Sequence, residues 1–434
     1  MGRIPAWRSG AALMLVACTA VAHPPPSGHP TLVPPSGAAL GSSAAASPGS
    51  AGPTPPRPRI LLTDASWTRA IDGVVAGRDV AVAVGVRGRI IYLHRGRTPR
   101  VLASNEKILT SMTALDVFGA RHRFPTVAAA DARVRGGRLR GNLWLIGAGD
   151  PGLTAARLAT LAARLHALGI RRITGSIEGD TSAFDRGWWA PGWLAGISRS
   201  YVTRPTALAI DGNRGAGSPE RDAASALRAG LVALGVRIRG GALAGPAPEH
   251  LRRLAWIRSA PLASLVHSQN HDSVNFIAEM LTKALGARVE GRGSTAAGAR
   301  AIRAWARGWH VRASVRDGSG LSDQDRTSPL GMVTLLLDAR RAPWRAVFVR
   351  SLPTPGQGTL TDRLVGLRVR AKTGTLFVRP ASALSGYVRT ASGTIAAFSI
   401  LTAGYGSCEA EPIEDAIVRL LAGARIPGAA DGPA

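Results

Sequence analysis

Ser104 and Lys107 lie three residues apart at the start of an apolar-periodic stretch. The spacing of the apolar residues predicts a helix that begins at Ser104 and carries Lys107 one turn later on the same face. A serine hydroxyl beside an amine that can lose its proton is a pairing suited to nucleophilic catalysis. The apolar residues at helical spacing are Ile108, Leu109, Met112, Leu115 and Phe118.

Lysine is rare in this chain. Of its 54 Lys and Arg residues, only Lys107, Lys283 and Lys372 are Lys. Arg keeps its proton under ordinary conditions, whereas a Lys that is buried or crowded by charge can act as a base, so the remaining lysines are candidates for chemistry. Lys372 begins a second short motif, Lys372-Thr373-Gly374-Thr375. A lone S-x-x-K also fits a helix start with a solvated lysine, so this motif alone leaves both interpretations open.

Composition limits the class of protein. A chain of 434 residues suits two or three domains, and its 52 Gly and 29 Pro indicate many turns and some unstructured sequence. The formal charge of +27 raises the question of a polyanionic partner. The arginines are spread along the chain without a basic block, zinc-finger spacing or RNA-binding aromatic motif, which argues against nucleic acid. Attraction to an anionic envelope surface explains the charge better.

The N-terminal sequence predicts an export segment followed by a tether. Residues 1–22 resemble a secretory signal that ends at a small-residue cleavage site, and Leu15-Val16-Ala17-Cys18 offers a lipoprotein signal as an alternative, with an uncleaved anchor as a third. Residues 23–59 hold eleven prolines and predict an extended, disordered tether. The working part is therefore expected outside the cytoplasm of a bacterium, secreted or held at the cell wall or membrane. With Cys18 and Cys408 at opposite ends, we expect no structural disulfide and a lone thiol at Cys408.

Strands are predicted near both ends of the folded part, with helices between them. This order implies one mixed α/β domain whose sheet uses both ends of the chain. The predicted strands are 80–86, 90–93, 126–135, 139–146, 171–178, 236–239, 368–371, 383–389 and 395–403, and the predicted helices are 155–168, 223–234, 261–285, 294–307, 328–340 and 412–421.

A third motif, Ser273-Val274-Asn275, completes a set that carries a family resemblance. S-x-x-K, S-x-N and K-T-G in this order resemble the active-site serine penicillin-recognising enzymes. Flanking segments sharpen the match to the D-alanyl-D-alanine carboxypeptidase/endopeptidase family, the class C low-molecular-mass penicillin-binding proteins. The resemblance covers about Arg59 to Leu421. The flanking segments are Trp144 to Pro151, Gly179 to Asp185, Ala278-Glu279 and Asp317 to Ser322.

The resemblance implies a fold and a domain plan. We expect a penicillin-binding-protein/β-lactamase-like transpeptidase domain, an antiparallel sheet flanked by helices, formed by residues 60–120 and 256–424. Residues 121–255 would be an inserted, smaller α/β accessory domain, and 425–434 a flexible tail.

The resemblance also implies the chemistry. Ser104 would attack the carbonyl between two D-alanines, Lys107 would take its proton in a site crowded by Lys372, and Ser273 would relay that proton to the leaving amine. Asn275 would hold the substrate amide. The expected product is that of a serine-type D-Ala-D-Ala carboxypeptidase, or of an endopeptidase, with no metal or organic cofactor.

The K-T-G strand is implied to bind the substrate. Its residues Lys372, Thr373, Gly374 and Thr375 would form the site for the terminal carboxylate, and the backbone N–H groups of Ser104 and Thr375 would form the oxyanion hole. Peptidoglycan stem peptides and β-lactams are the expected partners.

Three departures from the family pattern stand out. Ser268-Gln269-Asn270 is a second S-x-N, and we prefer Ser273 because Ala278-Glu279 follow it at the family spacing. Val274 replaces a commonly polar residue, and Glu106 stands where a small or apolar residue is usual. The last two bear on substrate preference.

The sequence also allows other functions. A Ser-His-Asp hydrolase is disfavoured because this chain has no G-x-S-x-G arrangement with a partner histidine. His267, His271 and Asp272 have the spacing of metal ligands, but they fit a helix surface better. A β-lactamase shares the three motifs and remains an alternative. A catalytically weak penicillin-binding or cell-wall-binding scaffold is the non-enzymatic alternative.

Overall fold

The computed structural model describes residues 56–193, 198–215, 217–377 and 379–426. Within these residues no helix combines the length and apolar character needed to cross a membrane. The predicted export segment at 1–22 and most of the predicted tether at 23–59 lie outside this range, as do residues 427–434 of the predicted tail.

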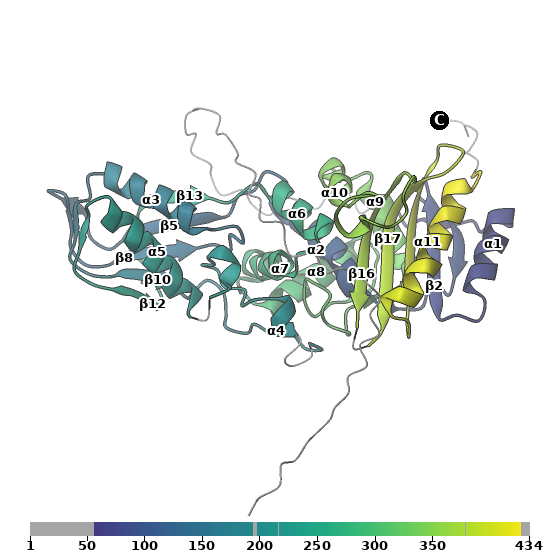
Figure 1. Cartoon of the computed structure of the whole chain (residues 1–434), viewed down its shortest axis with the longest axis horizontal. Coiled ribbons are helices and arrows are strands. Elements are labelled where there is room, and N and C mark those ends of the chain that lie inside the picture. The colour runs from purple at the N-terminus through teal and green to yellow at the C-terminus, as the bar shows by residue number, and fades with distance from the viewer. Residues whose placement is uncertain (1–55, 194–197, 216, 378, 427–434) are drawn as a thin grey trace, which may run out of the picture. The chain divides into compact units, whose positions relative to one another are not determined.

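A six-stranded sheet joins the two ends of the described chain (Figure 1). Its strand order is β1-β3-β2-β18-β17-β16. Its pairs are antiparallel, as expected, apart from the two-residue parallel pair of β1 and β3 at one edge. The mixed α/β fold with a sheet drawn from both ends is confirmed. The strands are β1 (Arg59–Ile60), β2 (Val80–Val86), β3 (Arg89–His94), β16 (Val369–Leu376), β17 (Ala381–Arg389) and β18 (Ile395–Thr402).

Both faces of this sheet are covered by helices, which explains the continuous apolar sequence of β2. Val82 packs on one face in a cluster that includes Ile71 of α1 and Ile417 of α11, while its neighbour Ala83 packs on the other face with Met332 of α9. Figure 1 shows α1 and α11 together on one side of the strands. The helices of this part are α1 (Ser66–Val75), α2 (Glu106–Phe118), α6 (Leu262–His271), α7 (Asn275–Glu290), α8 (Thr295–Gly308), α9 (Pro329–Ala339), α10 (Arg345–Ser351) and α11 (Ser407–Gly423).

The helical prediction at 261–285 is wrong at its centre, where the chain breaks between α6 and α7. Ser273 has a φ of 57°, a left-handed conformation that an α-helix cannot contain. The sequence pattern hid the break because Leu262 on one side and Met280 on the other pack into the same core at a spacing of whole helical turns, so the apolar periodicity continues across it.

The chain between α2 and α6 forms separate sheets with a hydrophobic cluster of their own. A five-stranded sheet has the order β12-β10-β8-β5-β13, and a small one the order β11-β9-β7-β6. These two sheets lie within the insertion predicted at 121–255, except that β13 continues past its end to Arg258. The elements are β5 (Pro125–Ala130), β6 (Val134–Arg135), β7 (Arg138–Leu139), β8 (Leu143–Gly147), α3 (Ala155–Ala167), β9 (Arg172–Ile173), β10 (Ile177–Asp180), α4 (Ser198–Tyr201), α5 (Pro219–Ala233), β11 (Arg237–Ile238), β12 (Ala242–Gly245) and β13 (Arg252–Arg258).

Three predicted strands in this region are wrong, because each is divided between the two sheets. The expected strand at 126–135 is divided into β5 and β6, that at 139–146 into β7 and β8, and that at 171–178 into β9 and β10. Gly175 lies between β9 and β10, and a Cβ there would lie 2.5 Å from the backbone oxygen of Gly141. The close approach of two backbones at this glycine is what interrupts the strand.

A three-stranded sheet, β14-β15-β4, completes the described elements, with β4 at Arg100–Val101, β14 at Ala313–Ser314 and β15 at Arg326–Thr327. Helix α1 is absent from the sequence-based prediction, although Trp67, Ile71 and Val75 recur at helical spacing and are buried.

The C-terminal part differs from expectation in two places. Ile426, inside the predicted flexible tail, is buried, and its carbonyl accepts a hydrogen bond from Ser392 Oγ at 2.7 Å. Cys408 forms a disulfide bond rather than being a lone thiol.

Candidate active site

Ser104 lies in a one-turn 3-10 helix, Ala103–Asn105, that leads directly into α2. Ala103 has a φ of 45°, a left-handed conformation that such a residue adopts only when its surroundings impose it. Asn105 is fully buried, and its Nδ2 donates to Ala383 O on β17 at 3.1 Å. The turn that carries Ser104 is therefore fixed against the sheet.

Lys107 is fully buried, and three oxygen atoms surround its Nζ. They are Ser319 O at 2.6 Å, Asn275 Oδ1 at 2.7 Å and Ser104 Oγ at 2.9 Å. Burial lowers the pKa of Lys107 to about 8, although nearby carboxylates act in the opposite direction. The contact that the helical spacing of Ser104 and Lys107 predicts is present.

Glu279 fixes the turn that supplies one of these oxygens. Its Oε1 accepts the backbone N–H of Gly318 at 3.0 Å and that of Ser319 at 2.8 Å. Burial raises the pKa of Glu279 to about 8, with the charge of Asp317 as the second cause. Sequence reasoning used Glu279 only to choose between two S-x-N motifs, and its contact with the turn next to Lys107 was missed.

Glu106 is fully buried, and neither of its carboxyl oxygens has a hydrogen-bond partner among the described residues. Burial raises the pKa of Glu106 well above its usual range, and the charges of Asp317 and Glu279 act in the same direction. Unlike Glu106, Asp317 accepts hydrogen bonds from backbone N–H groups of the following turn, including that of Gly320 at 2.6 Å. A group of buried acids therefore lies next to the Lys107 amine.

Ser273 lies at the break between α6 and α7, and Asn275 is the first residue of α7. Asn275 uses both ends of its amide. Its Oδ1 accepts from Lys107, and its Nδ2 donates to Tyr201 O at 3.1 Å. Ser273 lines the same cavity as Ser104.

The second S-x-N, residues 268–270, lies within α6. Its Asn270 is fully buried and hydrogen-bonded to Ser111 Oγ at 2.9 Å and Ser351 Oγ at 2.8 Å. No residue of this motif lines the cavity that contains Ser273. The geometry favours the Ser273 register and gives the upstream motif a packing role.

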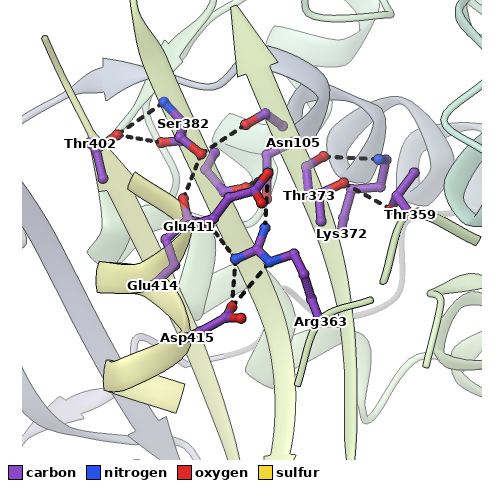
Figure 2. A network of polar contacts seen from close by, with 12 residues as sticks. Asn105, Thr359, Arg363, Lys372, Thr373, Ser382, Thr402, Glu411, Glu414 and Asp415 are labelled. Atoms are coloured by element: carbon purple, nitrogen blue, oxygen red, sulfur yellow. Dashed lines mark hydrogen bonds and ion pairs between the residues drawn. The ribbon is translucent and has the colours of Figure 1, made fainter. Parts of the chain in front are cut away.

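The K-T-G residues lie on β16, the edge strand of the large sheet. A Cβ on Gly374 would lie 2.9 Å from Ser104 N, so the strand packs directly against the serine turn because this residue is glycine. Lys372 is fully buried, and its Nζ donates to Thr373 O at 2.9 Å (Figure 2). Burial lowers the pKa of Lys372 well below its usual range, and the charge of Lys107 adds to this. The sequence analysis expected crowding by Lys372 to favour the neutral form of Lys107, whereas burial is the main cause of the lowered pKa of Lys107.

One cavity of about 390 Å³ brings these elements together. Lys107 and Lys372 lie behind its wall rather than in it. Seven further lining residues were not among the predicted site residues, although one of them, Leu321, lies in the segment 317–322 that carries the family resemblance. The predicted lining residues are Ser104, Ser273, Asn275, Thr373, Gly374 and Thr375, and the others are Gly192, Tyr201, Leu321, Asp323, Leu376, Phe377 and Arg379.

The histidines on α6 contact one another and the neighbouring Asp272. His267 and His271 stack with ring centroids 4.9 Å apart, and His271 Nδ1 contacts Asp272 Oδ1 at 2.6 Å. Within the described residues, no group of three or more His, Cys, Asp or Glu side chains is placed to hold a metal ion.

Sequence comparison identifies the family. Residues 67–216 and 214–424 match the D-Ala-D-Ala carboxypeptidase 3 (S13) family. The chain belongs to this family. It is 31% identical over 448 aligned residues to a D-alanyl-D-alanine carboxypeptidase of Actinomadura sp. strain R39, covering 81% of this chain and 82% of that relative. It is also 27% identical to the carboxypeptidase Rv3627c of Mycobacterium tuberculosis, over 76% of each chain.

Solved structures agree on the fold of this S13 family member. Penicillin-binding protein 4 of Haemophilus influenzae superposes with a TM-score of 0.73 at 22% identity, over 83% of this chain and all of that one. The predatory peptidoglycan endopeptidase Bd3459 of Bdellovibrio bacteriovorus gives a TM-score of 0.52 at 18% identity, over 79% of this chain and 92% of that one. The chain is therefore a peptidase with a penicillin-recognising fold.

Proposed function

We propose that this protein removes the terminal D-alanine from peptidoglycan stem peptides through an acyl-enzyme on Ser104. The observation that carries the proposal is the arrangement of three oxygens around Lys107 Nζ, one of them Ser104 Oγ. Membership of a D-Ala-D-Ala carboxypeptidase family supports the substrate class.

Lys107 can serve as the base because two of its three contacts accept hydrogens only. Ser319 O and Asn275 Oδ1 cannot donate, so they take the two hydrogens of a neutral amine. The lone pair of that amine is then directed at the third contact, the hydroxyl of Ser104 at 2.9 Å. With a pKa of about 8, a substantial fraction of Lys107 is neutral near pH 7 to 8.

The reaction follows from these positions. Ser104 Oγ attacks the carbonyl between the two D-alanines, and its proton passes to Lys107. Ser273, in the same cavity, relays this proton to the nitrogen of the leaving D-alanine as the peptide C–N bond breaks. Water then attacks the ester, which releases the shortened peptide and restores the Ser104 hydroxyl.

The edge of β16 supplies the binding groups. Thr373 and Thr375 line the cavity, with the Lys372 amine immediately behind them. A substrate carboxylate arriving here favours the charged form of Lys372 and offsets the effect of burial. The N–H groups of Ser104 and Thr375 are the proposed oxyanion donors, and the fit of Gly374 against Ser104 N keeps the two peptides close.

Cleavage of cross-linked peptides by the same acyl-enzyme is the related endopeptidase activity, and the structural neighbour Bd3459 bears that name. β-Lactams are expected to acylate Ser104 as well, since a neighbour of the same fold is described as acylated by penicillin G. We place this activity outside the cytoplasm, in accordance with the export segment predicted from the sequence.

Fluorescent penicillin labelling tests the proposal. The full chain should bind the label covalently, and the Ser104→Ala variant should not. D-Alanine release from a synthetic D-Ala-D-Ala peptide, followed with the same two proteins, separates a peptidase from a penicillin-binding scaffold. Rapid loss of the label with no D-alanine release would indicate a β-lactamase instead.

A further inference from the structure

A polar network behind the K-T-G strand connects it to helix α11 (Figure 2). Ser382 on β17 pairs in register with Thr375 on β16. The Ser382 hydroxyl lies 2.8 Å from Glu414 Oε1 of α11 and 3.3 Å from Gly374 O of the K-T-G motif. None of the sequence motifs includes Ser382 or Glu414.

Glu414 is fully buried between α11 and the sheet. Its Oε2 accepts from Arg363 at 2.8 Å, and Arg363 also pairs with Asp415 at 2.6 Å and Glu411 at 3.6 Å. Arg363 and Glu411 are the charged groups that act on Glu414, and the hydroxyl of Ser382 is its hydrogen-bond partner from the described part of the sheet. The buried carboxyl of Glu414 is thus connected by hydrogen bonds, through the Ser382 hydroxyl, to the strand that lines the cavity.

The direction of the Gly374–Thr375 peptide follows from the pairing of β17. Ser382 N donates to Thr402 Oγ1 at 3.0 Å, so the backbone groups of Ser382 face β18 and those of the next residue, Ala383, face β16. Gly374, the partner of Ala383, therefore directs its carbonyl toward β17. The N–H of Thr375 belongs to the same planar peptide and points the opposite way, to the open edge beside the cavity.

The Ser382 hydroxyl has one hydrogen and two acceptors, Glu414 and Gly374 O. When Glu414 is ionised, the charged oxygen at 2.8 Å takes this hydrogen. When Glu414 is protonated, its own O–H donates to Ser382 Oγ, and the Ser382 hydrogen is free for Gly374 O. A hydrogen bond to that carbonyl polarises the peptide and makes its N–H a stronger donor.

We propose that Glu414 is a positioning residue that acts through Ser382 to set how strongly the Thr375 N–H stabilises the developing oxyanion. The proposal rests on the proposed function, in which this N–H belongs to the oxyanion hole. Burial raises the pKa of Glu414 to about 7 against the opposing charge of Arg363. The protonated, acylation-promoting form is therefore lost as pH rises through about 7.

Acylation rates with a fluorescent penicillin, measured on the full chain from pH 5.5 to 9, test this proposal. Glu414→Gln keeps a donor toward Ser382 at every pH, so its rate should equal that of the wild type at pH 6 and exceed it about two- to fivefold at pH 8.5. Ser382→Ala removes the connection. Its rate should be about two- to fivefold below wild type at pH 6 and approach wild type at pH 8.5.

Two controls isolate the connection. Ser385→Ala removes another buried hydroxyl of β17, one that bonds to Ser399 instead, and Glu409→Gln removes an exposed acid of α11 that has no contact with Arg363 among the described interactions. Both ratios to wild type should be independent of pH. With a D-Ala-D-Ala peptide, Glu414→Gln should change kcat with KM unchanged.

The outcomes are distinguishable. Ratios for Glu414→Gln and Ser382→Ala that do not vary with pH, or that vary equally in the controls, overturn the proposal while leaving the acyl-enzyme intact. Absence of labelling in the wild type overturns the proposed function and this proposal with it. If Ser382→Ala does not fold, the isosteric Glu414→Gln variant decides the question.

Discussion

Asn275 Oδ1 lies 2.7 Å from Lys107 Nζ, closer than the serine that this lysine is proposed to activate. The other end of the same amide is bonded to Tyr201 O. The family resemblance assigns Asn275 to the substrate amide, but the structure adds a contact with the base itself. Asn275 therefore determines which hydrogens the amine keeps and where its lone pair points.

Asn275→Asp should shift the pH dependence of acylation upward. A carboxylate beside Lys107 favours the charged amine and raises its pKa by about one unit or more. Acylation by a fluorescent penicillin at pH 7 should therefore fall about tenfold and partly recover above pH 9. An Asn275→Asp protein with the wild-type pH midpoint would show that this contact does not control the base.

The pH dependence of the wild-type reaction follows from the same lysine. Burial lowers the pKa of Lys107 to about 8, and only the neutral amine accepts the Ser104 proton. The acylation rate should rise with pH and level off above a midpoint near 8. Stopped-flow measurement on Glu414→Gln gives this midpoint without the opposing effect proposed for Glu414. A rate that falls between pH 7 and 9 in that variant would contradict the base assignment.

Substitution by Arg separates a base from a fixed charge. Lys107→Arg should abolish both penicillin labelling and D-alanine release, since a guanidinium does not give up its proton near neutral pH. Lys372→Arg should weaken binding while leaving measurable acylation. Lys283→Arg is the matched control, because Lys283 is also fully buried but bonds to Asp185 away from the cavity. Near wild-type acylation by Lys107→Arg would remove its proposed role.

The lysines also show how much of the site could be predicted from the sequence. The rarity of Lys and two short motifs pointed to Lys107 and Lys372, and each is hydrogen-bonded to a residue that lines the cavity. Yet all three lysines are fully buried, and Lys283 has no contact with the cavity. In this arginine-rich chain the rarity of Lys therefore marks buried positions, and only some of these take part in the proposed chemistry.

The α/β fold and the three motifs followed from local pattern and order along the chain. The supporting contacts did not, because they join residues far apart in the sequence. Glu279 acts through the Gly318–Ser319 turn, and Glu414 lies next to Ser382 only after α11 packs on the sheet. The break at Ser273 was likewise hidden, since the helices before and after it share one core.

The duplicated S-x-N gives a direct test of register. Ser273→Ala should slow acylation by about 10² or more, as loss of a proton-transfer group does. Ser268→Ala should have little effect, because this residue does not line the cavity. Parallel labelling rates for the two variants decide between them, and the reverse ranking would mean that Ser268 is the functional serine.

Glu106 should make the folded protein less stable as the pH rises. Its pKa is well above the usual range in the folded state because both carboxyl oxygens are buried without partners among the described residues. In the unfolded chain a Glu ionises near its ordinary pKa, so folding takes up a proton above that pH and stability declines as pH increases toward the folded-state pKa. Glu106→Gln removes this one contribution while the other buried acids remain in both proteins. The difference in Tm between Glu106→Gln and wild type should therefore grow from pH 5 to pH 8. Glu249→Gln, at an exposed position, should show no such growth. A constant difference across this range would mean that Glu106 is ionised in the folded protein and held by a partner.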